Sequence, residues 1–169
     1  TMTIYLAAVE YLDSIGCRAD SFWSLELRPT DTVSTPQEVR QYASQVMGQA
    51  IELRDLESTK QQRSILEQAI DFINEQYSDE SISLDKVAKK VNISPNYLSA
   101  VFSQEVGQTL IEYITSKRIE EAKHLLRQAD IRLGEIAFAV GYKDPHYFSF
   151  VFKKVTGCTP SEYRKGCRQ

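Results

Sequence analysis

Residues 94–107 read SPNYLSAVFSQEVG, and residues 144–157 read DPHYFSFVFKKVTG. At a constant offset of 50, the two stretches share Pro, Tyr, Ser, Val, Phe and Gly. The match continues past the glycines with a shared Thr, Glu and Tyr. Sequence similarity at a fixed offset indicates a repeated structural unit, so the two stretches are expected to fold alike.

Each stretch carries the signals of a capped helix. Ser94 and Asp144 are residue types that cap helix N-termini, and each precedes a proline, which suits the first helical position. Gly107 and Gly157 are expected to stop the helices, because glycine readily adopts the left-handed conformation that ends many helices. The sequence therefore predicts two short helices of the same construction.

The segments before these helices repeat as well. VAKKVNI (87–93) aligns with IAFAVGY (136–142) at an offset of 49, so the following turn is one residue longer in the second copy, with Lys143 as the extra residue. Each copy is thus a short helix, a tight turn and a capped helix. That order predicts a helix-turn-helix.

The helix between the two copies sets their separation. Its apolar pattern predicts a helix from about residue 109 to 127, and about 19 residues span roughly 28 Å. Successive major-groove segments on one face of DNA lie about 34 Å apart. The predicted fold is mainly α: two helix-turn-helix subdomains joined by a long linker helix over residues 62–169, preceded by a small, mostly helical segment over residues 1–61.

The N-terminal segment gives weaker signals. Residues 4–15 are predicted to form a helix, residues 21–28 a strand and residues 29–36 a loop. A further helix is predicted to start at Pro36, with Thr35 and Glu38 as a capping box. Apolar residues then follow a seven-residue repeat: Val39, Tyr42, Val46, Leu53 and Leu56. This repeat has two interpretations, a short coiled coil that forms a homodimer through residues 36–57, or packing within the chain.

The polar stretch DLESTKQQR (55–63) is predicted to be a connector or a solvated helical segment. It separates the acidic N-terminal part from the repeated part. The net charge is −4 over residues 1–61, +1 over residues 62–169 and +4 over residues 143–169, as Lys and Arg minus Asp and Glu. Phosphate binding depends on a local patch, so the overall charge of −3 does not exclude nucleic acid.

Composition excludes several classes of protein. No apolar run approaches the roughly 20 residues of a membrane span, and the start lacks the features of a signal peptide. Three sparse cysteines favour a reducing cytoplasm over a disulfide framework, and with two histidines we expect no metal site and no cofactor. The sequence offers no nucleophile–base pair or glycine loop, so we do not expect an enzyme.

The second helix of each copy has an apolar and a polar face. The residues expected to pack inward are Leu98, Val101 and Phe102 in copy one, and Phe148, Val151 and Phe152 in copy two. The residues left facing outward are Asn96, Ser99, Ala100 and Ser103, and His146, Ser149, Phe150 and Lys153. A slight rotation of the helix would make Phe150 a core residue. Tyr97 and Tyr147 are predicted to be core residues rather than stacking platforms for bases.

With these motifs in place, the sequence resembles the AraC-type transcription regulators. The resemblance covers about residues 63–166 and is carried by KRIEEAKHLL (117–126), IRLGEIAFAVGY (131–142), the run at 144–157 and TPSEYRK (159–165). FINEQYSDESISL and SPNYLSAVF are most similar to the C-terminal domain of YesN-type response regulators. The resemblance implies a transcription regulator that acts as an activator, with double-stranded DNA and RNA polymerase as partners. It also implies that residues 1–61 are the last part of a middle region that lies between a receiver domain and the DNA-binding domain.

By position, the resemblance also implies which residues read bases. They are Asn96, Ser99 and Ala100 in copy one, and Pro145, His146, Ser149 and Phe150 in copy two. Several relatives carry Arg or Gln at the positions of Ala100 and Phe150, so bidentate guanine recognition is not expected from these two positions. Asn96 is able to read adenine, and His146 to donate to an acceptor edge. We therefore expect modest selectivity with an A/T bias.

Phosphate contacts are predicted mainly in the second copy. The candidates are Ser94, Arg132, Lys143, Asp144, Lys153 and Lys154. Such contacts fix the register of the protein on DNA and make binding salt-dependent. Two alternatives stay open: the lysine pair is merely a solvated face, or the repeated units form a helical protein-interaction module without DNA binding.

Overall fold

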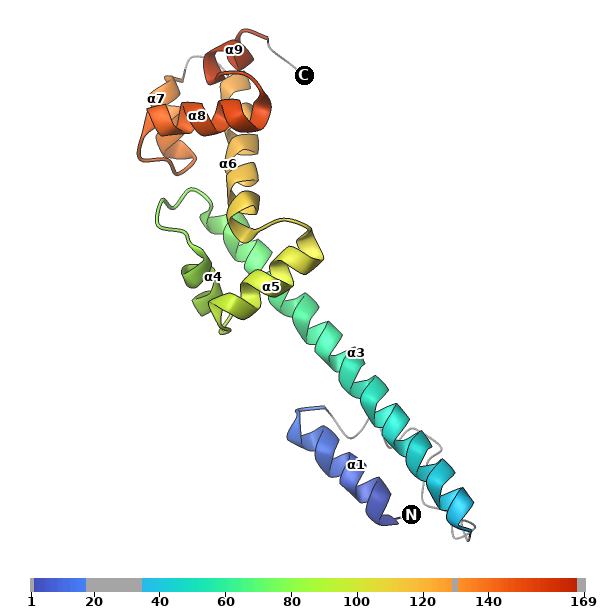
Figure 1. Ribbon diagram of the computed structural model, residues 1–169. Coiled ribbons are helices and arrows are strands. Elements are labelled where there is room, and N and C mark those ends of the chain that lie inside the picture. Colours follow the sequence, from blue (N-terminus) through green and yellow to red (C-terminus); the bar gives the residue numbers. More distant parts are fainter. Residues whose placement is uncertain (1, 18–34, 129–130, 167–169) are drawn as a thin grey trace. The chain divides into compact units, whose positions relative to one another are not determined.

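The computed structural model describes residues 2–17, 35–128 and 131–166. Within these residues every regular element is an α-helix, which confirms the predicted fold class. The helices are α1 (Met2–Ser14), α3 (Pro36–Gln76), α4 (Leu84–Lys90), α5 (Pro95–Val106), α6 (Leu110–Arg127), α7 (Leu133–Ala139), α8 (Pro145–Thr156) and α9 (Pro160–Arg164) (Figure 1). The predicted strand over residues 21–28, and residues 29–34 of the predicted loop, lie outside the described residues.

The chain divides into two compact units, residues 1–63 and residues 64–169. In the first unit, α1 packs against the first half of α3. The buried residues of this contact are Tyr5, Ala8, Leu12 and Cys17 on one side and Tyr42, Val46 and Ala50 on the other. Two residues of the predicted seven-residue repeat, Tyr42 and Val46, are therefore used for packing within the chain.

The helix α3 begins as the sequence predicts. The Thr35 backbone N–H donates to Glu38 Oε2 at 2.9 Å, and the Glu38 N–H donates back to Thr35 Oγ1 at 3.2 Å. The helix then continues without a break through residues 55–63, so this polar stretch is a solvated helical segment. Such a long helix with little apolar character in its middle keeps its polar side chains in water.

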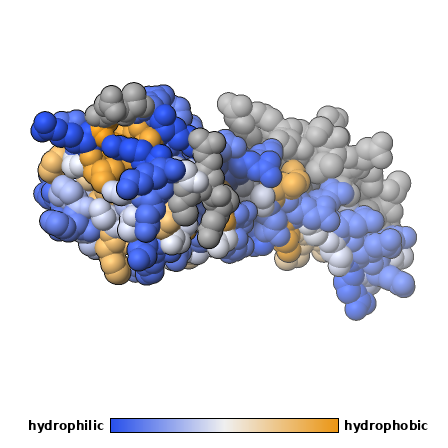
Figure 2. Space-filling model, turned by 90° about the horizontal axis from the view of Figure 1, so that it is seen from above, coloured by the Kyte–Doolittle hydropathy of each residue, from blue (hydrophilic) through white to orange (hydrophobic). Residues whose placement is uncertain are grey.

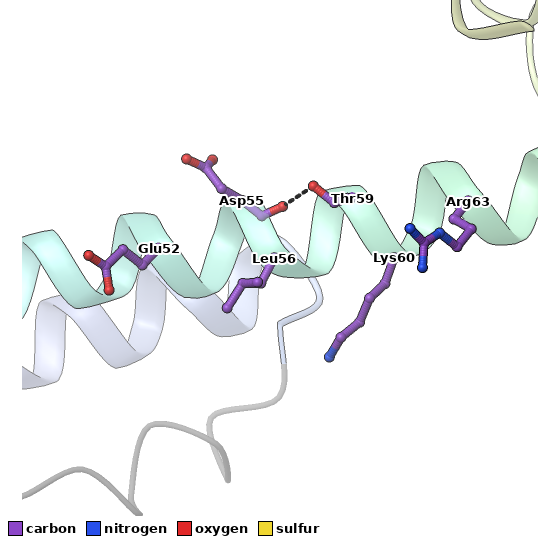
Figure 3. A pocket seen from close by; sticks show the side chains of 6 residues that line it. All are labelled: Glu52, Asp55, Leu56, Thr59, Lys60 and Arg63. Carbon is purple, nitrogen blue, oxygen red and sulfur yellow. Dashed lines mark hydrogen bonds between the residues drawn. The ribbon is translucent and has the colours of Figure 1, made fainter. Parts of the chain in front are cut away.

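A shallow hollow lies along this polar part of α3. Figure 3 shows the side chains that line it: Glu52, Asp55, Leu56, Thr59, Lys60 and Arg63. All six belong to one helix, and Thr59 Oγ1 donates to the Asp55 carbonyl at 2.8 Å. Among the described residues, one helix face supplies the lining of this hollow, as on the surface of a solvated helix.

The second unit contains two helix-turn-helix motifs built on one shared helix. In the first motif, α4 and α5 enclose a core with the end of α3 and the start of α6, where Leu110 and Ile114 are buried. In the second, α7 and α8 pack on the far half of α6, where Ile119, Ala122 and Leu126 are buried. Figure 1 shows α6 running between the two helix pairs. The 18 residues of α6 correspond to about 27 Å, as the sequence predicts.

The predicted inner faces of α5 and α8 are confirmed. Leu98, Val101 and Phe102 are buried in the first motif, as are Phe148, Val151 and Phe152 in the second. The repeat extends to ring packing. Phe102 meets Tyr113 edge to face with ring centroids 5.5 Å apart, and Phe152 meets Tyr163 in the same way at 5.6 Å. Corresponding positions of α5 and α8 thus contribute to the two cores.

The helix ends also follow the sequence. Ser94 Oγ accepts from the Tyr97 N–H at 3.2 Å, and Asp144 Oδ1 accepts from the His146 N–H at 2.8 Å. Gly107 and Gly157 end their helices with φ of 75° and 81°, a left-handed conformation that glycine adopts without a steric cost. On the face that Figure 2 shows, hydrophilic residues predominate and hydrophobic ones gather in small patches.

The prediction that Tyr97 and Tyr147 are core residues is wrong. Their side chains are 42% and 58% exposed. Each is the third residue of its helix and lies beside the buried stripe rather than within it, because the next residue, Leu98 or Phe148, points directly into the core. Shared identity between the copies therefore marks a common surface position here, not a common core position.

Candidate nucleic-acid interface

The orientation of α5 and α8 follows from their buried stripes. Because each stripe packs against the preceding short helix and α6, the opposite face of each helix points to solvent. In the view of Figure 1 both helices run from left to right, so their N-terminal ends lie on the same side of α6. This is the arrangement that two recognition helices need to approach one duplex.

In α5 the predicted base-reading residues share the outer face. Asn96 and Ala100 are exposed, and Ser99 between them is half-buried. Asn96 is the second residue of the helix, so its amide stands near the N-terminal end, where a recognition helix contacts base edges. The three residues of copy one thus lie in the N-terminal half of α5.

In α8 the corresponding face is larger and more apolar. His146 and Phe150 are exposed, and Phe150 is exposed to 65%, so it belongs to the outer face and not to the core. Pro145 and Ser149 are half-buried. Ser149 Oγ donates to the Pro145 carbonyl at 2.8 Å, which leaves the hydroxyl oxygen as an acceptor.

The predicted phosphate contacts differ in their surroundings. Lys153 and Lys154 are exposed in the last turn of α8, and no ion pair involves either of them among the described residues. Lys143 Nζ instead lies 2.9 Å from Glu80 Oε1. Arg132 is exposed directly before α7.

The two capping residues offer different charges at the helix N-termini. Ser94 presents a neutral hydroxyl at the start of α5, whereas Asp144 places a carboxylate at the start of α8. A carboxylate at this position already satisfies part of the positive end of the helix dipole. A phosphate would therefore meet a more favourable charge at the start of α5 than at the start of α8.

Sequence reasoning missed a groove between α6 and α8. It has a volume of about 490 Å³, and its lining includes Ile111, Thr115, Tyr147, Phe150, Lys154 and Val155. Phe150 and Lys154, predicted to contact DNA, thus help to line the groove between the two motifs. The signal in the sequence was faint, because single exposed apolar residues such as Ile111 are ordinary on protein surfaces.

Sequence reasoning also missed Arg118 of α6. This residue lies between Ile114 and Ala122 on the buried stripe, at a spacing of four residues on either side, and its side chain is half-buried. A charged residue in register with a buried stripe is a usable sequence signal, because such a charge needs partners when it is taken out of water.

The described residues do not form a metal-binding cluster. They contain no group of three or more His, Cys, Asp or Glu side chains placed to hold a metal ion. None of the helices in residues 2–17, 35–128 and 131–166 is long and apolar enough to cross a membrane.

Comparison with known proteins places the repeated part of the chain among DNA-binding regulators. The family model for a helix-turn-helix domain matches residues 87–166. The chain is 36% identical to the arabinose operon regulatory protein of Escherichia coli over 102 residues, which are 60% of this chain and 35% of that protein. The chain therefore spans little more than a third of that relative.

This chain matches a larger share of two solved structures. The C-terminal domain of AraT, a response regulator from Geobacillus stearothermophilus, is 40% identical, with a TM-score of 0.59 over 60% of this chain and 84% of that one. The C-terminal domain of the two-component response regulator yesN from Fusobacterium nucleatum is 37% identical, with a TM-score of 0.57 over 58% of this chain and 95% of that one.

Proposed function

Because the chain belongs to the AraC-type family of helix-turn-helix proteins, we propose that it regulates transcription by binding double-stranded DNA, with α5 and α8 in adjacent major grooves. The observation that carries this proposal is the pair of outward faces held on one helix. Each face begins at the N-terminal end of its helix, and the length of α6, about 27 Å, compares with about 34 Å for one helical turn of DNA.

The two faces suggest a division of roles. In α5, Asn96 is suited to read adenine through its amide, while Ala100 offers a methyl group to thymine. In α8, His146 is able to donate to an acceptor edge and Phe150 to pack against thymine methyl groups, while Lys153 and Lys154 contact phosphates. Three further residues complete these two surfaces: Ser99, Pro145 and Ser149. We also propose contacts to the DNA backbone from Ser94, Arg132, Lys143 and Asp144. This composition favours A/T-containing sites.

Selection of bound duplexes from a random DNA pool tests the proposal most directly. We expect a bipartite site with two half-sites about one helical turn apart and few guanines beneath the two recognition helices. Binding of the selected duplex should weaken steeply with salt, because phosphate contacts release counterions. A G-rich consensus would contradict the residue assignments, and the absence of binding even at low salt would favour a protein-interaction module.

The first unit is proposed to belong to a regulatory or dimerisation region that ends near residue 61. Tyr42 and Val46 of the predicted repeat are buried within the chain, so a homodimer through residues 36–57 would need other residues. The exposed apolar side chains available on α3 are Met47, Ile51 and Leu56. Sedimentation of the chain with and without its selected duplex tests the dimer.

We further propose that the protein acts in the cytoplasm and activates transcription through contact with RNA polymerase.

A further inference from the structure

Arg118 connects the two helix-turn-helix motifs at the middle of α6. Its Nε donates to the Tyr77 carbonyl at 2.7 Å, and its Nη2 donates to the Asp79 carbonyl at 2.9 Å. Both carbonyls belong to the segment that follows α3, in the first motif. On the other side, the guanidinium lies 5.1 Å from the ring centroid of Tyr142, in the turn of the second motif. One side chain thus contacts both motifs.

The turn of the second motif packs directly against the same segment. Gly141 has a φ of 90°, and a Cβ at this position would lie 2.8 Å from the Ser78 carbonyl oxygen and 2.9 Å from Arg118 Nη2. Any side chain there would push the two motifs apart, because real Cβ atoms do not approach other atoms so closely. The absence of a side chain at Gly141 is therefore what allows the contact.

The extra residue of the second turn adds a third contact. Lys143 Nζ lies 2.9 Å from Glu80 Oε1, which again joins the second turn to the segment after α3. Both side chains are largely exposed, so this ion pair is weak by itself. Among these contacts between the two motifs, those of Arg118 are the strongest. It is partly desolvated, which lowers the pKa of its guanidinium, and it is held by two carbonyls and an aromatic face.

We propose that Arg118, Gly141, Tyr142 and the Lys143–Glu80 pair form a clasp that fixes the angle and separation between α5 and α8, and so sets the half-site spacing that the protein accepts. Each recognition helix is anchored in its own core, and between the cores α6 is a single helix. The clasp adds a second, independent connection and thereby restricts rotation of one motif about the axis of α6. This inference rests on the proposed DNA binding, with Arg118 as a positioning residue.

The test compares Arg118→Met with Lys123→Met. The control also removes a cation from α6. Lys123 pairs with Glu120 of the same helix, so its ion pair does not connect the two motifs. Affinities are measured for the duplex selected by the wild-type chain, for the same duplex with one or two base pairs inserted between the half-sites, and for each half-site alone. For wild type and for Lys123→Met, the insertion of base pairs between the half-sites should lower the affinity about tenfold or more. Arg118→Met should bind the original duplex about tenfold more weakly and lose the spacing preference, with half-site affinities unchanged.

Each result separates the inference from the proposed function. An Arg118→Met variant that keeps the wild-type spacing preference overturns the clasp and leaves DNA binding intact, whereas a wild-type chain that selects no duplex overturns the proposed function. Loss of half-site binding would indicate misfolding of Arg118→Met, and Arg118→Lys would then take its place in the test, because lysine keeps the charge but lacks the planar guanidinium that donates to two carbonyls. NMR residual dipolar couplings test the clasp without DNA: one alignment tensor should fit both motifs in wild type and fail in the variant.

Discussion

The two helix-turn-helix motifs have the same turn but different neighbours. In the first turn Asn92 adopts a φ of 57° and is exposed, and in the second Gly141 adopts a φ of 90° and is buried. The turn geometry agrees, since the Ile93 N–H donates to the Ala88 carbonyl at 3.1 Å and the Tyr142 N–H donates to the Ala137 carbonyl at 2.9 Å. The left-handed residue is thus a local requirement of the turn, whereas the absence of a side chain at Gly141 is a requirement of the surroundings.

The largest effect is expected from exchanging these two residues. Gly141→Asn should lower the free energy of unfolding of the second unit by about 2–4 kcal/mol, because the new Cβ collides with the Ser78 carbonyl and displaces Arg118. Asn92→Gly should change it by no more than about 1 kcal/mol, because this position is exposed and already left-handed. Urea unfolding followed by tyrosine fluorescence measures both.

Gly141→Ala sharpens the result, since alanine adds the colliding Cβ with no further atoms. It should destabilise the second unit nearly as much as asparagine does. Equal and small effects of the exchanges at positions 92 and 141 would mean that the segment after α3 moves away easily, and that the two turns differ only in composition.

A second difference between the motifs is the charge on the recognition helices. Lys153 and Lys154 occupy the last turn of α8, and the equivalent positions of α5 hold Ser103 and Gln104. Replacing both lysines with Ala should reduce the slope of log affinity against log salt by about 2, because each phosphate contact contributes about 0.9. Replacing Ser103 and Gln104 with Ala should leave the slope unchanged. Fluorescence anisotropy with the selected duplex measures both slopes.

The converse variant, with Ser103→Lys and Gln104→Lys, tests whether α5 lies equally close to the phosphates. A steeper salt dependence would show that the first motif approaches DNA in the same manner. If instead the lysine-to-alanine variant keeps the wild-type slope, the lysine pair is only a solvated face.

The sequence predicted the helix caps and buried faces that the two copies share. It missed most of the contacts that one copy makes with the other. The caps at Ser94 and Asp144 and the buried stripes of α5 and α8 were all readable, because they depend on neighbours within a few residues. The clasp depends on the approach of residues 77–80 to residues 141–143, which no local pattern encodes. Arg118 left a trace as a charge within an apolar stripe, but only the fold identifies its partners.

A smaller effect concerns the capping boxes that begin α6 and α9. Thr109 Oγ1 accepts from the Glu112 N–H at 3.2 Å, and Thr159 Oγ1 accepts from the Glu162 N–H at 3.3 Å. Thr109→Ala should destabilise the second unit by about 1–2 kcal/mol, because α6 contributes to both cores. Thr159→Ala should cost about 0.5 kcal/mol, because the five residues of α9 are able to fray alone. Thermal unfolding measures both, and equal costs would indicate that α9 unfolds only together with the rest of the second unit.

The smallest effect distinguishes the glutamates of these two boxes. Donation from the backbone and hydroxyl groups of Thr109 and Thr159 lowers the pKa of Glu112 and of Glu162, so each carboxylate stabilises the fold above the ordinary glutamate pKa and this contribution is lost as pH falls through the lowered value. Lys153 and Lys165 lower the pKa of Glu162 further. Lys153→Ala should therefore raise the pKa of Glu162 and leave that of Glu112 unchanged, as measured by NMR titration of the side-chain carboxyl carbons. Added salt should have the same direction of effect on Glu162, because screening weakens the attraction of the lysines. Equal responses of the two glutamates would show that the charge of α8 does not reach the α9 capping box, and that the two copies share their electrostatics as well as their scaffold.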